Sequence, residues 1–128
     1  MYVPYRLRIA LIILSIGSWY DQPILAQSPV SPDAQLSIAG AVAFTEGPAW
    51  HPSGNVYFTD ITNNRIMRLD PNGEMHVYRK PSGRSNGLLF DPQLRLLCCE
   101  GGGPEGNRRV TRIELNGTVT VLANRFNG

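Results

Sequence analysis

Residues 47–60, GPAWHPSGNVYFTD, recur 40 positions later as residues 87–100, GLLFDPQLRLLCCE. Both copies keep the leading glycine, an aromatic residue two positions before a proline, an apolar run and a final acid. The stretch 65–73, RIMRLDPNG, also recurs, as residues 109–117, RVTRIELNG, at an offset of 44. Repeats of about 40 to 45 residues that hold four short strands are typical of β-propeller blades. The sequence therefore predicts an all-β fold with about two blades.

Turn residues divide each copy into four strands. Asn72-Gly73 and Asn116-Gly117 are predicted to supply the positive φ of a tight two-residue hairpin turn. The proline-containing segments 51–54 and 91–94 are the predicted turns between the first and second strands of each copy. The glycine-rich segment 101–106 is a loop insertion that accounts for the larger second offset.

The inner strands are apolar on both faces, as in residues 56–58, VYF, and 96–99, LLCC. Such strands must be covered on both sides, which blades stacked around an axis provide. Residues 118–121, TVTV, alternate instead, as expected of an outermost strand. Because neighbouring strand residues point to opposite faces, Cys98 and Cys99 are not expected to bond to each other, and both read as small buried apolar residues.

The N-terminus has the composition of an export signal. Two arginines in the first eight residues precede the apolar segment 9–19, which is too short for a bilayer span of about 20 residues. We expect a signal peptide over residues 1–26, with an uncleaved membrane anchor as the alternative, and a secreted or periplasmic location. Residues 27–35, rich in Ser and Pro, are the expected linker, and residues 36–128 the expected propeller part.

Composition excludes several classes of partner. The formal net charge is +2 and the basic residues are scattered, so we expect no nucleic-acid partner. After signal cleavage no stable membrane span is expected. His51 and His76 lack the spacing of a zinc site.

Four segments in register resemble one family. Residues 44–50, FTEGPAW, followed by residues 56–60, VYFTD, resemble the opening of the gluconolactonase and senescence-marker-protein (regucalcin) family. Residues 64–73 and 83–92, which carry NRI, DPNG, GRSNGL and DP, continue the resemblance in the same order. It implies the N-terminal part of a six-bladed β-propeller and the metal-dependent hydrolysis of a sugar lactone such as glucono-1,5-lactone.

The resemblance also implies a site. Glu46 corresponds to a family ligand of a divalent cation, calcium or zinc, at the mouth of the propeller channel. Oxygen ligands of this kind suit a hard cation. Arg84 and Asn86 correspond to the family's R-x-N segment, which binds the lactone or lies beside the metal. Many relatives have an aspartate between that asparagine and the glycine, whereas Gly87 follows Asn86 directly here.

Other parts of the family site are expected beyond Gly128. The family's further metal ligands are an asparagine and an aspartate, and the aspartate is also the candidate base, so the catalytic base is unknown here. One carboxylate cannot satisfy a cation that takes about six to eight oxygens, so we expect a truncated chain that is inactive alone. Asp60 and Glu100, at equivalent repeat positions, either line the channel or bond loop amides. The alternative function is a noncatalytic secreted β-propeller that binds a ligand or a protein.

Overall fold

The computed structural model describes residues 30–125 of the chain. The chain divides into two units, residues 1–36 and residues 37–128. In the first unit the described residues 30–36 form no strand or helix and are exposed. The expected signal peptide, residues 1–26, lies outside the described residues. Among the residues that are described, no helix is long and apolar enough to cross a membrane.

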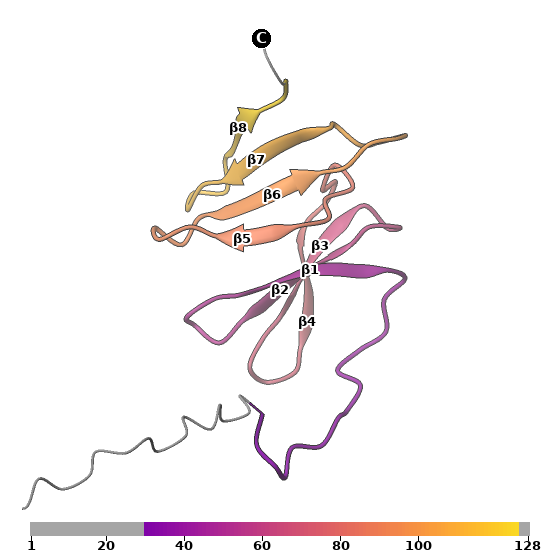
Figure 1. The fold of residues 1–128 in the computed structure, drawn as a ribbon, viewed down its shortest axis with the longest axis vertical. Helices are drawn as coiled ribbons and strands as arrows, with labels where there is room; N and C mark the ends of the chain where they lie inside the picture. The colour runs from indigo at the N-terminus through magenta and orange to yellow at the C-terminus, as the bar shows by residue number, and fades with distance from the viewer. Residues whose placement is uncertain (1–29, 126–128) are drawn as a thin grey trace, which may run out of the picture. The chain divides into compact units, whose positions relative to one another are not determined.

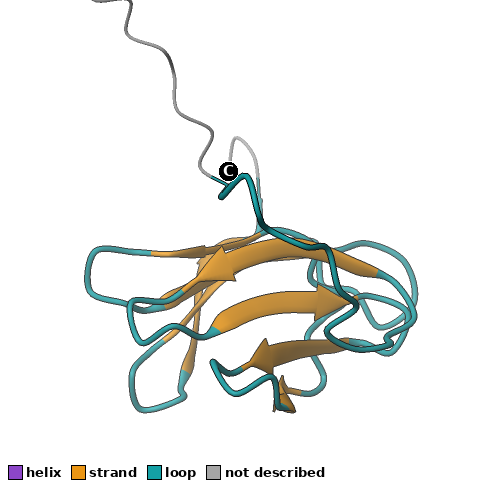
Figure 2. Ribbon diagram, turned by 90° about the horizontal axis from the view of Figure 1, so that it is seen from below, coloured by secondary structure: helices purple, strands orange, loops and turns teal. Residues whose placement is uncertain are grey.

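The second unit consists of two four-stranded antiparallel sheets (Figure 1). The first sheet contains β1 (Thr45–Trp50), β2 (Val56–Asp60), β3 (Arg65–Leu69) and β4 (Met75–Arg79), and the second contains β5 (Leu88–Phe90), β6 (Leu96–Glu100), β7 (Arg109–Ile113) and β8 (Val119–Ala123). Only strands and loops occur in the described part of the chain, as Figure 2 shows. The predicted all-β fold is therefore confirmed.

Each sheet has the meander order of a propeller blade. The strands follow each other in sequence, β1 to β4 in one sheet and β5 to β8 in the other. The second sheet meets the first through β5, which lies against β1 and β2, whereas β8 lies farthest from the first sheet (Figure 1). The innermost strands of the two sheets are thus neighbours, as in adjacent blades around a propeller axis.

Four of the six connections between adjacent strands close in one way. A carbonyl oxygen accepts a hydrogen bond of 2.8 to 3.0 Å from the amide three residues later, and the residue that donates has positive φ. The donors are Gly54, Gly73, Leu94 and Gly117. Each loop therefore holds three residues and ends in a left-handed residue. The predicted two-residue turns were wrong because only the glycine of each Asn-Gly pair adopts positive φ.

The core lies between the two sheets. Its buried apolar residues are Ala49, Tyr57, Ile66, Leu96, Cys98 and Ile113. The Tyr57 ring packs edge-on against the Phe90 ring at 5.0 Å, which joins β2 to β5. Burial raises the pKa of the Cys98 thiol to about 11. Both thiols are free, as predicted, but Cys99 is exposed, so the expectation that it is buried was wrong.

The other face of the first sheet carries a pocket of about 500 Å³. Val56 and Phe58 line it together with Leu69 and Met75, and the Glu46 residue lies at its wall. Successive strand residues point to opposite faces, so Phe58 points away from the second sheet while Tyr57 points toward it. The apolar run on β2 therefore has one face in the core and one face in this pocket.

Candidate functional site

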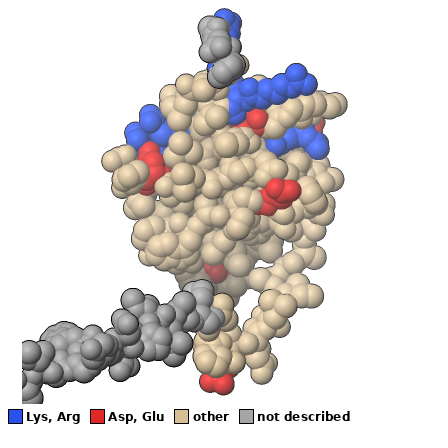
Figure 3. Space-filling view, viewed as in Figure 1, with Lys and Arg blue, Asp and Glu red and all other residues tan. Residues whose placement is uncertain are grey.

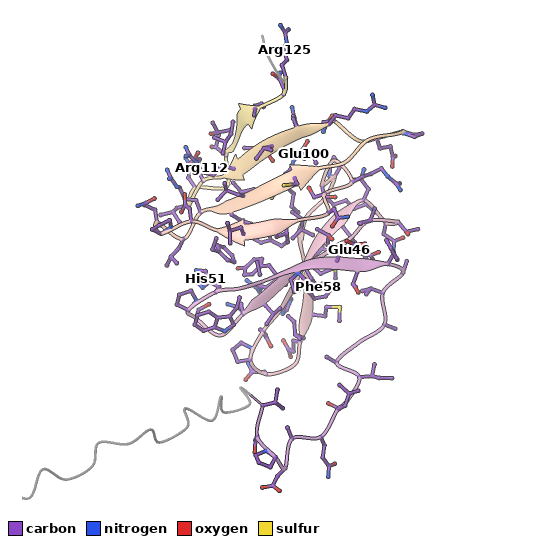
Figure 4. All side chains as sticks on the ribbon, viewed as in Figure 1. Glu46, His51, Phe58, Glu100, Arg112 and Arg125 are labelled. Atoms are coloured by element: carbon purple, nitrogen blue, oxygen red, sulfur yellow. The ribbon has the colours of Figure 1, made fainter. Side chains whose placement is uncertain are left out.

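One end of the two sheets gathers the residues singled out by the sequence. Glu46, at the start of β1, and Glu100, at the end of β6, lie toward one end of the strands in Figure 4, and His51 and Arg112 toward the other. The loop of residues 82–87 reaches this same end because it leads into β5, which pairs in antiparallel fashion with β6. We call residues 44–46, 60–64, 82–87 and 100–108 the Glu46 end.

Glu46 carries a carboxylate without a partner. The residue is half-buried and pairs with Thr59 across β1 and β2, just before an irregularity in the register. Within residues 30–125 its side chain makes no hydrogen bond or ion pair. A half-buried carboxylate normally acquires a partner, since removing a charge from water costs free energy. Glu46 is therefore available to a ligand.

Asn86 lies beside Glu46 and occupies the equivalent position of the second repeat. Each precedes a glycine, which is Gly47 within β1 and Gly87 just before β5. The hydroxyl of Thr59 lies 2.9 Å from the Glu46 carbonyl oxygen and 3.2 Å from the Asn86 carbonyl oxygen. The Asn86 side chain is exposed and has no hydrogen bond among the described residues. The fold thus brings two of the three predicted site residues together.

The close approach depends on Gly47. Its φ is +54°, and a Cβ built there would collide with the Asn86 carbonyl oxygen. Only glycine has both the backbone freedom and the missing side chain that this crossing of the two sheets requires. The glycine of the EGP motif therefore has a packing role beside the carboxylate that precedes it.

Arg84 lies on the loop that leads to Asn86. Its φ is +52°, a left-handed conformation that is uncommon for a residue with a side chain. Its amide donates to the Asn64 Oδ1 atom at 2.8 Å, and its guanidinium has no partner in the described part of the chain. The three predicted site residues therefore share one property. Each has a polar side chain that makes no hydrogen bond or ion pair with the described residues.

The Asp60 carboxylate is fully hydrogen-bonded. Its side chain is 0% exposed and accepts hydrogen bonds from the Asn63 side chain at 2.8 Å, the Arg65 Nε atom at 2.9 Å and the Phe44 amide at 3.4 Å. Burial by itself raises the pKa of Asp60, but these bonds and the Arg65 charge outweigh it, so the pKa is lowered from its ordinary value. The residue fixes the turn after β2.

Glu100 joins the two sheets. Its side chain is 0% exposed, and Arg79, from β4 of the first sheet, donates to it at 2.9 Å. Donors from the second sheet are Asn107 at 2.6 Å, Arg109 at 2.8 Å and Thr111 at 3.0 Å. Burial raises the pKa of Glu100, yet the bonds from Arg109, Asn107 and Arg79 lower it further than burial raises it. Asp60 thus accepts a main-chain amide, that of Phe44, as one of the two expectations had it, whereas Glu100 bonds side chains of β4, β7 and the loop before β7.

A second group of possible metal ligands lies at the opposite end of the first sheet. Ligand atoms of Asp70, Glu74 and His76, on the β3–β4 hairpin, lie within 4.8 Å of one another. The sequence did not indicate this group, because His76 has no other ligand at the spacing of a zinc site. In the equivalent hairpin of the second sheet, β7–β8, the Thr120 hydroxyl donates to the Glu114 carboxylate at 2.8 Å, which joins the two strands across the turn. In the first sheet the Asn72 and Glu74 amides donate to Asp70 Oδ1 at 2.9 Å, and His76 Nε2 lies 3.4 Å from Asp70 Oδ2, so the group has a role in closing its hairpin.

Charges on the surface are mixed. On the face drawn in Figure 3, Lys and Arg side chains gather over the second sheet, with acidic side chains among them. Several are paired, for example Arg95 with Asp91 at 2.7 Å and Arg112 with Glu114 at 2.8 Å. Basic and acidic side chains are therefore interspersed and partly paired on this face.

The chain is similar to known lactonases. Residues 44–127 match the model of the SMP-30/Gluconolactonase/LRE-like region. A gluconolactonase from Xanthomonas campestris, described as important in glucose secondary metabolic pathways, is 28% identical with a TM-score of 0.61, over 68% of this chain and 28% of that one. A putative gluconolactonase is 30% identical with a TM-score of 0.59, over 68% and 29% of the two chains.

A third solved structure shares the fold alone. It is a virginiamycin B lyase from Staphylococcus aureus, 21% identical with a TM-score of 0.53, over 72% of this chain and 32% of that one. No curated protein matches the chain. The chain spans less than a third of the length of each of these solved structures. Because the family model covers most of the chain, including the whole of both sheets, the chain belongs to the SMP-30/gluconolactonase/LRE-like family.

Proposed function

We propose that this chain supplies part of the active site of a metal-dependent enzyme that hydrolyses a sugar lactone such as glucono-1,5-lactone. Membership of the gluconolactonase family supports the reaction class. The single observation that carries the site is the half-buried Glu46 carboxylate, which has no partner among the described residues although Asp60 and Glu100 at the same end are fully bonded.

The donors at the Glu46 end fit a divalent cation such as calcium or zinc. Glu46 offers a free carboxylate, and the neighbouring Asn86 offers a free carboxamide oxygen. Both are oxygen ligands of the kind that a hard cation prefers. When bound, such a cation supplies a Lewis acid that polarises the ring carbonyl of a lactone. Glu46 is the residue of this chain that would hold it.

Arg84 and Asn86 are proposed to bind the sugar. Their side chains are free among the described residues and carry donors that can bond the hydroxyl and carbonyl oxygens of a lactone. Such bonds orient the ring for attack by water. A cation that takes about six to eight oxygens needs more ligands than these, so we expect the 128-residue chain alone not to turn over lactone.

We also propose that the protein is exported. The arginines and short apolar segment of residues 1–26 favour a periplasmic or secreted protein whose mature chain begins after Ala26. Fractionation of cells and N-terminal sequencing of the exported protein test it. Recovery of an intact N-terminus in the cytoplasm would contradict it.

The hydrolysis experiment uses the full-length gene product and glucono-1,5-lactone. Ring opening releases an acid, so a pH-stat follows the reaction directly. We expect proton release above the spontaneous rate, loss of that activity after chelation and recovery with added calcium or zinc. A folded protein that binds the lactone but never exceeds the spontaneous rate would favour a noncatalytic propeller instead.

A further inference from the structure

We infer that Asn64 is a positioning residue that holds the loop of residues 82–86 in the conformation that presents Arg84 and Asn86 to the lactone, an inference that rests on the proposed function. Asn64 lies between β2 and β3, at the start of the NRI segment, to which the family resemblance assigns no role in the site. The argument for its role comes from the contacts of its carboxamide.

The Asn64 side chain is the centre around which the loop folds. The residue is 7% exposed and has a φ of +52°. Its Oδ1 atom accepts hydrogen bonds from the Ser82 amide at 3.1 Å, the Ser82 hydroxyl at 3.1 Å and the Arg84 amide at 2.8 Å. Its main-chain carbonyl oxygen also accepts from the Ser82 amide, at 2.9 Å. One buried side chain thus satisfies three donors of a loop 18 to 20 residues later in the sequence.

The loop needs such support because two of its residues are left-handed. Gly83 has a φ of +68° and Arg84 a φ of +52°. A left-handed conformation costs a residue with a side chain free energy that surrounding bonds must offset. The Asn64–Arg84 bond acts on the amide of the strained residue itself. It therefore fixes the direction in which the Arg84 side chain leaves the backbone.

The same support extends to Asn86. The Ser85 hydroxyl donates to the Ser82 carbonyl oxygen at 2.7 Å, and both serines are 0% exposed. The Asn86 amide then donates to the Cys99 carbonyl oxygen at 3.0 Å, where the loop enters the second sheet. A shift of Ser82 would therefore be passed to Asn86 and to its contact with Gly47.

The opposite side of the loop is equally crowded. A Cβ at Gly83 would lie 2.5 Å from the Glu100 Oε2 atom and 2.7 Å from the Asn107 Nδ2 atom. The Gly101 amide donates to the Gly83 carbonyl oxygen at 3.0 Å. The loop is thus held between Asn64 of the first sheet and Glu100 of the second, and only the Asn64 side bonds to the amide of Arg84.

The test compares three variants of the full-length gene product. Asn64→Gly tolerates the positive φ but removes the carboxamide, Asn64→Asp keeps an acceptor oxygen at the same place, and Asn63→Ala removes the neighbouring asparagine, which bonds Asp60 rather than the loop. We expect Asn64→Gly to raise the KM for glucono-1,5-lactone about tenfold with a smaller change in kcat, since a displacement near 1 Å can cost up to about 100-fold in catalysis. Asn64→Asp should restore only part of the affinity, because it also loses the Nδ2 donor that lies 3.4 Å from the Glu105 carboxylate and places a negative charge there. Asn63→Ala should leave the KM unchanged.

Two further readouts separate this role from general stability. The affinity for calcium or zinc, which depends mainly on Glu46, should change less than the KM in Asn64→Gly, and exchange of the Arg84 amide hydrogen should be faster. A folded Asn64→Gly variant with the parent KM, or one in which Asn63→Ala has the same effect, would overturn the inference while the proposed function stands. A parent protein with no lactonase activity would remove the proposed function and this inference with it.

Discussion

The main chains of Glu46 and Asn86 meet at one hydroxyl, that of Thr59, which lies 2.9 Å from the first carbonyl oxygen and 3.2 Å from the second. The two residues are equivalents in successive repeats. The contact sets the separation of the two main chains at the positions from which the Glu46 and Asn86 side chains extend. Its loss should therefore affect both the packing of the sheets and the site.

Thr59→Val tests this contact, because it replaces the hydroxyl by a methyl group of similar size. The two carbonyl oxygens lose the one hydroxyl proton that they share, so we expect a loss of about 0.5 to 1.5 kcal/mol in the free energy of unfolding. Urea unfolding of the full-length gene product measures it. Thr62→Val is the control, since Thr62 is exposed and its hydroxyl has no partner in the described part of the chain. Equal effects of the two changes would show that the bridge contributes nothing.

Gly47→Ala tests the close approach of the two sheets. The new Cβ would collide with the Asn86 carbonyl oxygen, and the alanine would have to adopt a φ of +54°. We expect it to destabilise the protein by more than the roughly 1 to 2 kcal/mol that a left-handed alanine costs. Gly73→Ala is the matched control, because its φ is +85° and no atom lies within 4 Å of the added Cβ. If both variants unfolded at the same urea concentration, the contact with Asn86 would not matter.

Leu94→Gly should stabilise the protein. Leu94 closes the β5–β6 hairpin with a φ of +62°, at the position that Gly54, Gly73 and Gly117 occupy in the three other hairpins that close in the same way. Relief of the left-handed strain, about 1 to 2 kcal/mol, exceeds the added entropy cost of glycine, so we expect a gain of roughly 0.5 to 1 kcal/mol. Thermal unfolding measures the change. A lower melting temperature would mean that the half-exposed leucine packs more favourably than its contacts indicate.

Glu100→Gln should destabilise the protein and flatten its response to acid. The charge of Glu100 is buried against Arg79 and Arg109, and loss of one partner of a buried pair costs about 3 to 5 kcal/mol. Because the pKa is lowered from 4.5 in the folded state, the unfolded chain binds the proton more readily. The stabilisation is present above about pH 5 and is lost as the pH falls through the folded-state pKa. Unfolding free energies measured from pH 7 to 3 should fall less steeply in Glu100→Gln, and parallel slopes would contradict the assignment.

The repeat was sufficient to predict the sheets but not the details of their turns. The offsets of 40 and 44 located eight strands, because turn residues and apolar runs recur with them. The hairpin type was missed, since the asparagines before Gly73 and Gly117 keep negative φ. Cys99 was wrongly expected to be buried, because an apolar sequence does not show which face of an end blade is uncovered.

The candidate site was predicted only where a motif marks it. Glu46 and Asn86 precede recognisable glycines, and the structure places their main chains side by side. Asn64 stands in the NRI motif, but the motif does not reveal its role, because that role depends on donors 18 to 20 residues away that only the folded chain brings to it. The partner of Glu100 on the other sheet, Arg79, was hidden for the same reason.

The most direct test is calorimetric titration of the metal-free full-length gene product with calcium and with zinc. The account predicts one site whose affinity falls by more than about 100-fold in Glu46→Gln, beyond the 10- to 100-fold typical of residues outside the ligand shell. Glu74→Gln, which alters the other possible ligand group, should leave that site intact. Unchanged binding in Glu46→Gln, or loss of binding in Glu74→Gln instead, would contradict the account.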